Sequence, residues 1–463
     1  MTDQPTFAFV TIGSGSYVGS TVRDLILANA LHRRGFKVVV YWMMECKPEL
    51  AADGIKQRML CYAPRYHFRR PSEILDRVIA PLLFLFPLHA RVRVSQGIPG
   101  YADRLLENLT RCLHETPETD PVLVKRLLKF IALDDVSHLM MSFASICPLA
   151  LAAKKNSTLP FDYVVTFQGD EHFASYARKA GLLAVYRQRL KEVVQGSPWP
   201  AVVVSRDYLN RISEDMDLAP ERMSVVYNGI KLAERSEKPP FSILQSEFPA
   251  LKEHTPIVSY IGRQDTEKGI DLLLYAARLL QARGVALQLV VCGATAKGKC
   301  YRDAISGIAD HLRLDIHHVG SISPEVRDAL YAHSRCIVYP SICREPFGLV
   351  AVEAMSHGTP VIVPDYGGIT EVVQDGEIAG GLTFRTWDSG DLARQLERLL
   401  ADRSLHRELT EHTRMMAARF SDEQMADAIL EHLGIDARER RRDGTYGRVP
   451  GRRAIEEAHR ACV

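Results

Sequence analysis

Two glutamates in the stretch 341–373 are the first candidates for chemistry. Glu345 precedes a Pro-Phe-Gly turn, and Glu353 lies eight residues later in LVAVEAM, an apolar segment that predicts a helix. An ionised carboxylate among apolar residues is costly without partners, which indicates a ligand. The alternatives are a helix cap for Glu345 and a solvated position for Glu353. An acid and base pair that cleaves a glycoside is a third interpretation.

A second group of candidates lies in a predicted strand, polar loop and helix at 257–280. The loop carries Gly262, Arg263, Lys268 and Gly269 directly before the helix. Because the arginine and the lysine can face the same oxygens beside a helix N-terminus, the pattern predicts a diphosphate clamp. A solvated loop is the alternative.

The first half of the chain opens with a glycine loop between a predicted strand and helix. Gly13, Gly15 and Gly19 form a GxGxxxG pattern, in which backbone N–H groups could bind a phosphate. The pattern also resembles a dinucleotide fingerprint, with Glu45 as a ribose ligand. A tight turn that requires glycine torsions is the alternative.

Three polar residues follow the predicted strand DYVVTF. Gln168, Asp170 and His172 lie just past its carboxyl end, where open α/β sheets place their ligands. Asp170 could instead cap the helix that follows.

Composition limits the classes of protein that fit. A chain of 463 residues with 46% apolar and 25% charged residues predicts a globular protein of two domains. The net charge of +2 gives no support for nucleic-acid binding, so any anion site must be local. Nine cysteines without a CxxC pair fit a reducing cytosol, and the N-terminus lacks the pattern of a signal peptide, so we expect a cytoplasmic protein.

Alternating strand and helix patterns predict an α/β protein with two similar domains. The apolar run at 78–88 lies between arginines and is too short to span a bilayer, which favours a core segment over a membrane-interface segment. The expected parts are an N-terminal acceptor domain at 1–235 with an atypical insertion at about 55–150, a linker at 236–255, a donor-nucleotide domain at 256–400, C-terminal helices at 401–435 that return to the first domain, and a mobile basic tail at 436–463.

Taken together, the motifs resemble the retaining glycosyltransferases of family 4. The resemblance rests on IGRQDTEKGIDLLL, on VYPSICREPFGLVAVEAMSHGTPVIVPDYGGITEVV and on VVYNGI, and it is strongest from about 256 to 400. It implies the GT-B fold, in which two Rossmann-like domains face each other across a cleft. The first half of the chain is less typical.

The resemblance also implies roles for individual residues. Arg263 and Lys268 would bind the donor diphosphate, Glu345 the hydroxyls of the transferred sugar, and Glu353 the nucleotide ribose. Other positions would approach the donor mainly through the backbone: Gly19, Gly262, Phe347, Gly348 and Leu349.

One departure from the family concerns Gln168, since the family often carries histidine there. Gln168, Asp170 or His172 could take over the contact with the sugar or acceptor. We rank Asp170 and Gln168 equally, and Asp170 is also a candidate catalytic residue.

The implied reaction moves a sugar from a UDP- or GDP-linked donor to a hydroxyl of a glycan such as a polysaccharide, a glycolipid or a small solute. Fixed cations would stabilise the departing diphosphate, and its oxygen would take the acceptor proton, so that no metal, further cofactor or protein nucleophile is expected. Peripheral contact with the inner membrane is a further expectation. The alternatives are a catalytically silent GT-B scaffold and an NAD(P)-dependent oxidoreductase, which would leave the candidates of the second half unexplained.

Overall fold

The computed structural model describes most of the chain in seven stretches. Gly15, Glu45, the 78–88 run and the tail 436–463 lie outside them, together with much of the predicted insertion. Only the backbone is described at 101–106 and 108. The described residues are 4–13, 19–43, 50–60, 101–115, 119–233, 238–295 and 300–435.

The first domain is built on a parallel sheet of seven strands in the order β3-β2-β1-β4-β5-β6-β7. Its strands are β1 (Thr6–Thr11), β2 (Lys37–Trp42), β3 (Lys56–Met59), β4 (His138–Met141), β5 (Asp162–Phe167), β6 (Ala201–Val203) and β7 (Met223–Val225). Every residue of β1 is buried, as expected for a central parallel strand that is covered on both faces. β4 also lies in the middle of the sheet, although its residues fall in the range predicted to be an atypical insertion.

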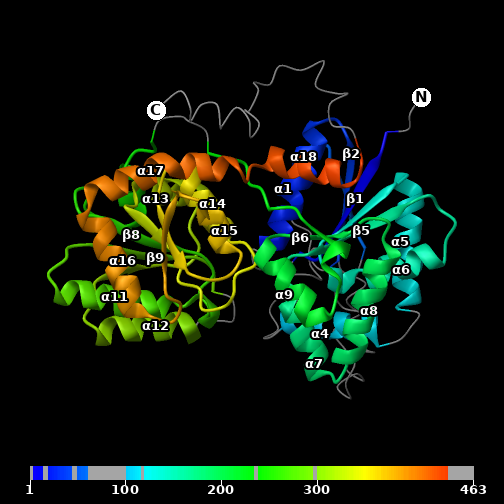
Figure 1. Ribbon diagram of the computed structural model, residues 1–463, viewed down its shortest axis with the longest axis horizontal. Coiled ribbons are helices and arrows are strands. Elements are labelled where there is room, and N and C mark those ends of the chain that lie inside the picture. Colours follow the sequence, from blue (N-terminus) through cyan, green and yellow to red (C-terminus); the bar gives the residue numbers. More distant parts are fainter. Residues whose placement is uncertain are drawn as a thin grey trace, which may run out of the picture.

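Helices cover both faces of this sheet (Figure 1). Phe7 and Phe9 of β1 pack in a core cluster with α1 and α18, whereas Ala8 and Val10 face the cluster that contains α5, α6 and α8. The helices of this domain are α1 (Gly19–Arg33), α4 (Tyr101–His114), α5 (Pro121–Asp134), η3 (Ala144–Ile146), α6 (Pro148–Lys155), α7 (Glu171–Lys179), α8 (Leu183–Gly196), α9 (Arg206–Met216) and η4 (Pro220–Arg222).

The second domain contains a parallel sheet of six strands in the order β10-β9-β8-β11-β12-β15. The strands are β8 (Ile257–Ile261), β9 (Gln288–Cys292), β10 (Ile316–His318), β11 (Cys336–Val338), β12 (Val361–Pro364) and β15 (Gly381–Phe384), and β13 (Gln374–Asp375) and β14 (Ile378–Ala379) form a separate antiparallel pair. Its helices are α10 (Ser242–Glu247), η5 (Thr266–Lys268), α11 (Ile270–Ala282), α12 (Cys300–His311), α13 (Pro324–His333), α14 (Leu349–Ser356), α15 (Ile369–Val373), α16 (Ser389–Ala401) and α17 (Arg403–Ala418).

The strand order reverses between β8 and β11. The chain runs from β8 outward to β9 and β10, and then returns to place β11 on the other side of β8. The loops that follow β8 and β11 must therefore diverge at a crevice, which is where open α/β sheets bind ligands. Arg263 and Lys268 lie in the first of these loops, and Glu345 lies in the second.

The expected linker at 236–255 and the expected C-terminal helices at 401–435 both contain helices that pack against a domain. Within 236–255, helix α10 packs against α13 of the second domain. Of the helices after 400, α17 packs against α14 of the second domain, whereas α18 (Asp422–His432) crosses over and packs against α1 (Figure 1). Arg33 and Arg34 of the first domain form ion pairs with Glu423 at 3.0 and 2.6 Å.

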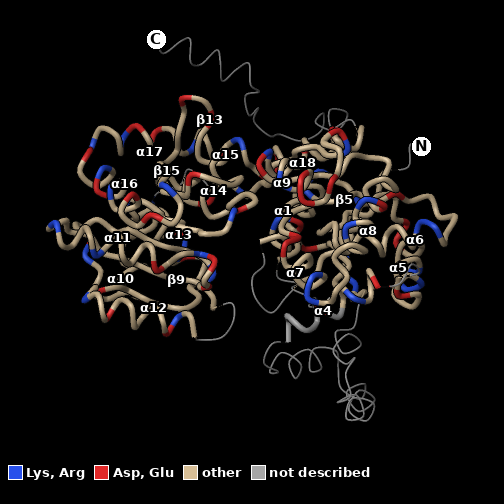
Figure 2. Tube along the Cα trace, turned by 60° about the horizontal axis from the view of Figure 1, so that its bottom comes forward, with Lys and Arg blue, Asp and Glu red and all other residues tan. Residues whose placement is uncertain are grey.

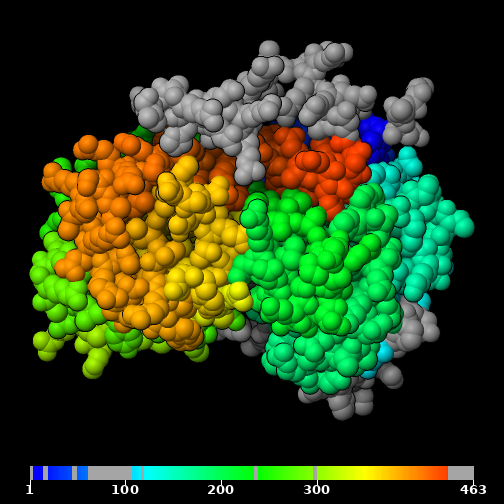
Figure 3. Space-filling model, viewed as in Figure 1, coloured from blue at the N-terminus to red at the C-terminus, as the bar shows by residue number. Residues whose placement is uncertain are grey.

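The two domains touch directly, as the adjoining yellow and green surfaces show (Figure 3). Lys and Arg are interspersed with Asp and Glu over both domains (Figure 2), in agreement with the nearly neutral charge of the chain. No helix within the described part of the chain is both long and apolar enough to cross a membrane.

Candidate active site

Lys268 and Glu345 form the centre of the candidate site. The Lys268 ammonium lies 2.7 Å from Oε2 of Glu345, and the two side chains are only 8% and 17% exposed. Ser341 donates a hydrogen bond to the same oxygen at 3.3 Å, and the Tyr339 hydroxyl donates to Oε1 at 3.4 Å. Glu345 does not cap α14, because Gly348 occupies the N-cap position.

Electrostatics keep both members of this pair charged. Burial opposes ionisation of Glu345, but Lys268 and then Arg263 outweigh it, so that the pKa of Glu345 lies below its usual value. Burial likewise opposes the charge on Lys268, but Glu345 and Tyr339 hold the lysine pKa above its usual value. The lysine ammonium also lies 5.2 Å from the centre of the Tyr339 ring, an arrangement that favours a cation. A fixed ammonium with one ionised partner is therefore present before any ligand binds.

The loop after β8 is shaped to bring its two cations together. Gly269 has φ +60°, and a Cβ there would lie 2.3 Å from the Pro340 carbonyl oxygen, so only glycine allows this contact with the loop after β11. The Arg263 guanidinium pairs with Asp265 at 3.2 Å, and its side chain remains 35% exposed. Arg263 is near enough to depress the pKa of Glu345. The structure thus brings Glu345 together with the two cations that the sequence placed in a separate loop.

Glu353 lies on α14 and has a different environment. It is half-buried, and its Oε2 accepts a hydrogen bond of 2.6 Å from Tyr331 of α13. Burial raises the pKa of Glu353, while the Tyr331 hydrogen bond and Arg327 act in the opposite direction. Glu353 is therefore not a solvated helix residue.

The start of α14 explains why Gly348 is required. Gly348 has φ +92°, and a Cβ there would lie 2.7 Å from Ile369. The Phe347 side chain is 3% exposed, and its ring centre lies 5.4 Å from that of Phe420, so this residue can reach a ligand only through its backbone. Leu349 is the first residue of α14, where the N–H groups lack intrahelical acceptors and can face an anion.

The other two predicted glycines differ in their surroundings. The Gly262 amide donates to the Cys292 carbonyl at 3.1 Å, and a Cβ at Gly262 would lie 2.9 Å from the Tyr260 hydroxyl. Close packing is therefore sufficient to explain Gly262. Gly19 is the first residue of α1, and a Cβ there would meet none of the described residues within 4 Å.

Gln168 is buried at the carboxyl end of β5. Its Nε2 donates to the Ser142 carbonyl at 2.5 Å and to Asp24 at 3.3 Å, which determines the orientation of the amide. Its Oε1 is buried and has no hydrogen-bond partner among the residues that the structure describes. A buried acceptor without a donor is uncommon, so Oε1 is a candidate for contact with a ligand.

Asp170 points into the first domain. Its Oδ1 accepts hydrogen bonds from the Ser145 amide, at 2.9 Å, and from the Ser145 hydroxyl, and its side chain makes no capping bond to α7. Burial raises the pKa of Asp170 to about 6, against the effect of the Ser145 hydrogen bonds. His172 is exposed on α7. The structure does not bring Asp170 into contact with the Lys268 and Glu345 pair.

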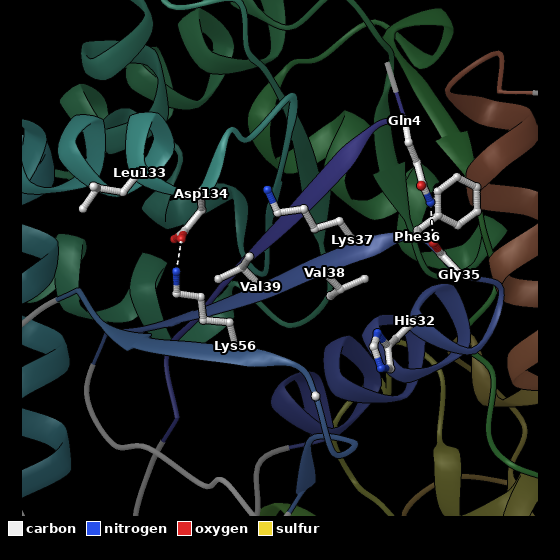
Figure 4. A pocket seen from close by; sticks show the side chains of 11 residues that line it. Gln4, His32, Gly35, Phe36, Lys37, Val38, Val39, Lys56, Leu133 and Asp134 are labelled. Carbon is white, nitrogen blue, oxygen red and sulfur yellow. Dashed lines mark hydrogen bonds and ion pairs between the residues drawn. The ribbon is translucent and has the colours of Figure 1, made fainter. Parts of the chain in front are cut away.

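A separate hollow lies in the first domain at the amino ends of β2 and β3, opposite to the carboxyl ends of the strands (Figure 4). Lys56 pairs there with the buried Asp134 at 2.7 Å, and Lys37 and His32 line the opening. Parallel α/β sheets bind ligands at the carboxyl ends of their strands, so this hollow is not part of the candidate site. Among the residues that the structure describes, no three His, Cys, Asp or Glu side chains form a group that could hold a metal ion.

Sequence reasoning missed several polar partners of the site. Tyr331 and Tyr339 lie in apolar patterns, which are typical of core residues, and Asp24 lies within a helix pattern. Ser205, a buried residue before α9, and Glu371 of α15 connect the two domains next to Glu345. The available signal for Ser205 was its residue type directly before a helix, since serine favours the N-cap position.

The chain matches one family model in the region of this geometry. Residues 243–416 match the model described as Glycosyl transferases group 1. The second half thus contains a glycosyl transferases group 1 domain. This range includes the loops that carry Arg263, Lys268 and Glu345, and helix α14, which carries Glu353.

Curated relatives of this glycosyltransferase domain match about half of the chain. A lipopolysaccharide 1,2-N-acetylglucosaminetransferase of Salmonella typhimurium is 29% identical over 237 residues, which are 50% of this chain and 61% of that protein. A D-inositol 3-phosphate glycosyltransferase of Salinispora arenicola is 30% identical over 284 residues, 57% of this chain and 62% of that protein. The chain thus spans about three fifths of the length of these relatives.

Solved structures match nearly the whole chain. A sucrose-phosphate synthase from Thermosynechococcus elongatus superposes with a TM-score of 0.69 and 20% identity, over 93% of this chain and 98% of the other. HepE from Anabaena, in complex with UDP and glucose, gives a TM-score of 0.65 and 16% identity, over 93% and 99%. At these identities the likeness concerns the fold, and the prediction of a GT-B fold with two Rossmann-like domains is confirmed.

Proposed function

We propose that this chain is a retaining, metal-independent glycosyltransferase of family 4 that moves a sugar from a UDP- or GDP-linked donor to a hydroxyl acceptor. The observation that carries the proposal is the buried pair of Lys268 and Glu345, with Arg263 beside it, at the switch point of the group 1 domain.

The two cations suit the charge that develops in this reaction. When the bond between sugar and phosphate breaks, negative charge grows on the departing diphosphate and positive charge on the anomeric carbon. Lys268 is already fixed by Glu345, so it stabilises that negative charge without reorganising during the reaction. Arg263 is more exposed and contributes a planar set of donors to the same oxygens.

The glutamates provide acceptors for hydroxyl groups. Glu345 is ionised and uses Oε2 for Lys268, so we assign Oε1 to a hydroxyl of the transferred sugar. Glu353 uses Oε2 for Tyr331, and we assign its other oxygen to the ribose. The start of α14, from Phe347 to Leu349, presents backbone to the donor.

In the first domain we assign the family's histidine position to Gln168. Its Oε1 can accept a hydrogen bond from a sugar or acceptor hydroxyl. Asp170 is the alternative for that contact: its Oδ1 binds Ser145 inside the domain, and its Oδ2, like Oε1 of Gln168, is buried without a partner among the described residues. With no protein nucleophile required, an oxygen of the departing diphosphate takes the acceptor proton, and the acceptor attacks from the face that the diphosphate leaves.

The acceptor class is suggested by the relatives. They include enzymes named for a lipopolysaccharide acceptor and for inositol 3-phosphate, so a glycan, a glycolipid or a small solute is the proposed acceptor of this chain. The neighbour HepE, in complex with UDP, supports a uridine nucleotide as the donor carrier. We place the reaction in the cytoplasm, with peripheral contact at the inner membrane when the acceptor is lipid-linked.

A donor screen tests this proposal. The protein is incubated with UDP-glucose, UDP-N-acetylglucosamine and GDP-mannose, and release of the nucleoside diphosphate is followed with and without glycan and inositol phosphate acceptors. We expect one donor to be used, and an NMR spectrum of the product to show the anomeric configuration of the donor. Inversion of that configuration would contradict the retaining mechanism, and the absence of turnover with every donor would favour a silent scaffold.

A further inference from the structure

A group of contacts between the domains lies directly beside Glu345. Glu371 of α15, in the second domain, reaches the start of α9 in the first domain. Its Oε1 accepts a hydrogen bond from the Asp207 amide at 2.7 Å, and its Oε2 accepts from the Arg206 amide at 3.1 Å and from the Tyr227 hydroxyl at 2.8 Å.

These contacts supply what the start of a helix lacks. The first amides of a helix have no intrahelical acceptor and carry the positive end of the helix dipole. The Glu371 carboxylate therefore caps α9 from the opposite domain. Ser205, the N-cap residue, is fully buried; its Oγ accepts from the Tyr208 amide at 3.1 Å and donates to the Pro346 carbonyl at 2.7 Å.

The loop that carries Glu345 is bound on both sides of that residue. Arg344 makes a two-pronged ion pair with Asp207, through Nε at 3.0 Å and Nη2 at 2.5 Å, and its carbonyl accepts from Arg211 at 3.2 Å. On the other side, the Pro346 carbonyl accepts from Ser205. The first domain thus holds the residues before and after Glu345.

Glycine makes this close approach feasible. A Cβ at Gly368 would lie 2.0 Å from the Pro346 carbonyl oxygen and 2.3 Å from Ser205 Oγ. The Gly368 amide donates to the Glu345 carbonyl at 2.8 Å. Glu371 lies three residues later, at the first turn of α15, so this hydrogen bond connects its helix directly to the Glu345 loop.

We propose that Glu371 is a positioning residue: together with Ser205, Asp207 and Arg344 it forms an interdomain latch that holds Glu345 against Lys268. This inference rests on the proposed function, because it concerns the same donor site. The donor site is complete when the latch is formed. A variant that weakens the latch lowers the fraction of molecules competent to bind donor, and the apparent affinity falls by that fraction.

The kinetic test uses Glu371→Ala and Glu371→Gln, with Glu377→Ala as the matched control, because Glu377 is an exposed glutamate of the same domain in the turn between β13 and β14. For Glu371→Ala we expect the donor KM to rise about tenfold while kcat stays within about twofold, because saturating donor restores the latched state. Glu371→Gln keeps one acceptor oxygen and should fall between wild type and alanine. If kcat and the free energy of unfolding both fall while the donor KM stays unchanged, Glu371 has a merely structural role.

Hydrogen exchange tests the latch independently of activity. We expect the Arg206 and Asp207 amides to exchange about tenfold faster in Glu371→Ala than in wild type or Glu377→Ala, while amides of α11 are unchanged. Unchanged exchange would overturn the latch. Faster exchange with an unchanged donor KM and UDP dissociation constant would overturn the positioning role. If wild type transfers no sugar and binds neither UDP nor GDP, the proposed function fails, and the exchange result still decides whether the latch exists.

Discussion

Replacement of Lys268 by alanine is the most informative single perturbation of the site. The change removes the ammonium 2.7 Å from Glu345, and both side chains are largely buried. Loss of one partner of a buried ion pair costs roughly 3 to 5 kcal/mol of unfolding free energy, because the remaining charge has no compensation. Loss of a fixed cation at the departing diphosphate should add about 3 to 4 kcal/mol to the barrier, or two to three orders of magnitude in rate.

A second substitution separates the two effects. In the double variant Lys268→Ala/Glu345→Gln the stranded carboxylate becomes a neutral amide of nearly the same shape, so we expect most of the lost stability to return. The rate should stay low, because the cation is still missing. Lys129→Ala, at an exposed position of α5, is the control for removal of a lysine.

The assay combines thermal or urea unfolding with release of nucleoside diphosphate at saturating donor. Lys268→Arg should retain more activity than alanine, since it keeps a cation at the same place. Near-normal turnover of Lys268→Ala would refute the role of the cation. Recovery of the rate together with stability in the double variant would show that Lys268 acts only on folding.

Further expectations concern the remaining parts of the site. Arg263→Ala should slow transfer by roughly two to three orders of magnitude with little loss of stability, because its ion pair with Asp265 is partly exposed; near-normal turnover would exclude it from the diphosphate clamp. Transfer should persist in excess EDTA, and abolition that Mg²⁺ reverses would reveal a metal site. Tyr331→Phe should raise the donor KM about fivefold, because it releases Glu353 from its hydrogen bond. An unchanged donor KM would argue against the contact between Glu353 and the ribose. Burial raises the pKa of Asp170 to about 6 from its usual 3.8, so its contribution to unfolding free energy is full below about pH 4 and is lost, by about 3 kcal/mol, as the pH rises through 6. In urea unfolding, the free energy of unfolding of Asp170→Asn should not show that fall with pH. If wild type and Asp170→Asn show the same dependence on pH, the raised pKa of Asp170 is contradicted.

Local patterns were sufficient to predict the elements that carry the site. Strand, polar loop and helix around Arg263 and Lys268 appear as β8, η5 and α11, and the apolar segment around Glu353 is α14. Alternation of strands and helices also predicted the two-domain α/β fold, because buried parallel strands leave continuous apolar runs.

Contacts across the fold could not be predicted in the same way. Lys268 meets Glu345 because β8 and β11 are neighbours in the sheet, and strand order is not encoded in any local pattern. Asp170 follows a strand end as ligand-binding residues do, yet its side chain turns inward to Ser145, a residue of a short 3₁₀ helix. The capping of α9 by Glu371 depends on how the domains meet, so a helix-start pattern alone could not identify it.

We propose above all that the second domain holds a nucleoside diphosphate through Arg263 and Lys268. Calorimetric titration of wild type and Lys268→Ala with UDP, GDP and NADH tests it most directly. We expect that UDP or GDP binds wild type, that the variant binds the same nucleotide at least tenfold more weakly, and that NADH does not bind. Binding of NADH without binding of either nucleoside diphosphate would contradict it.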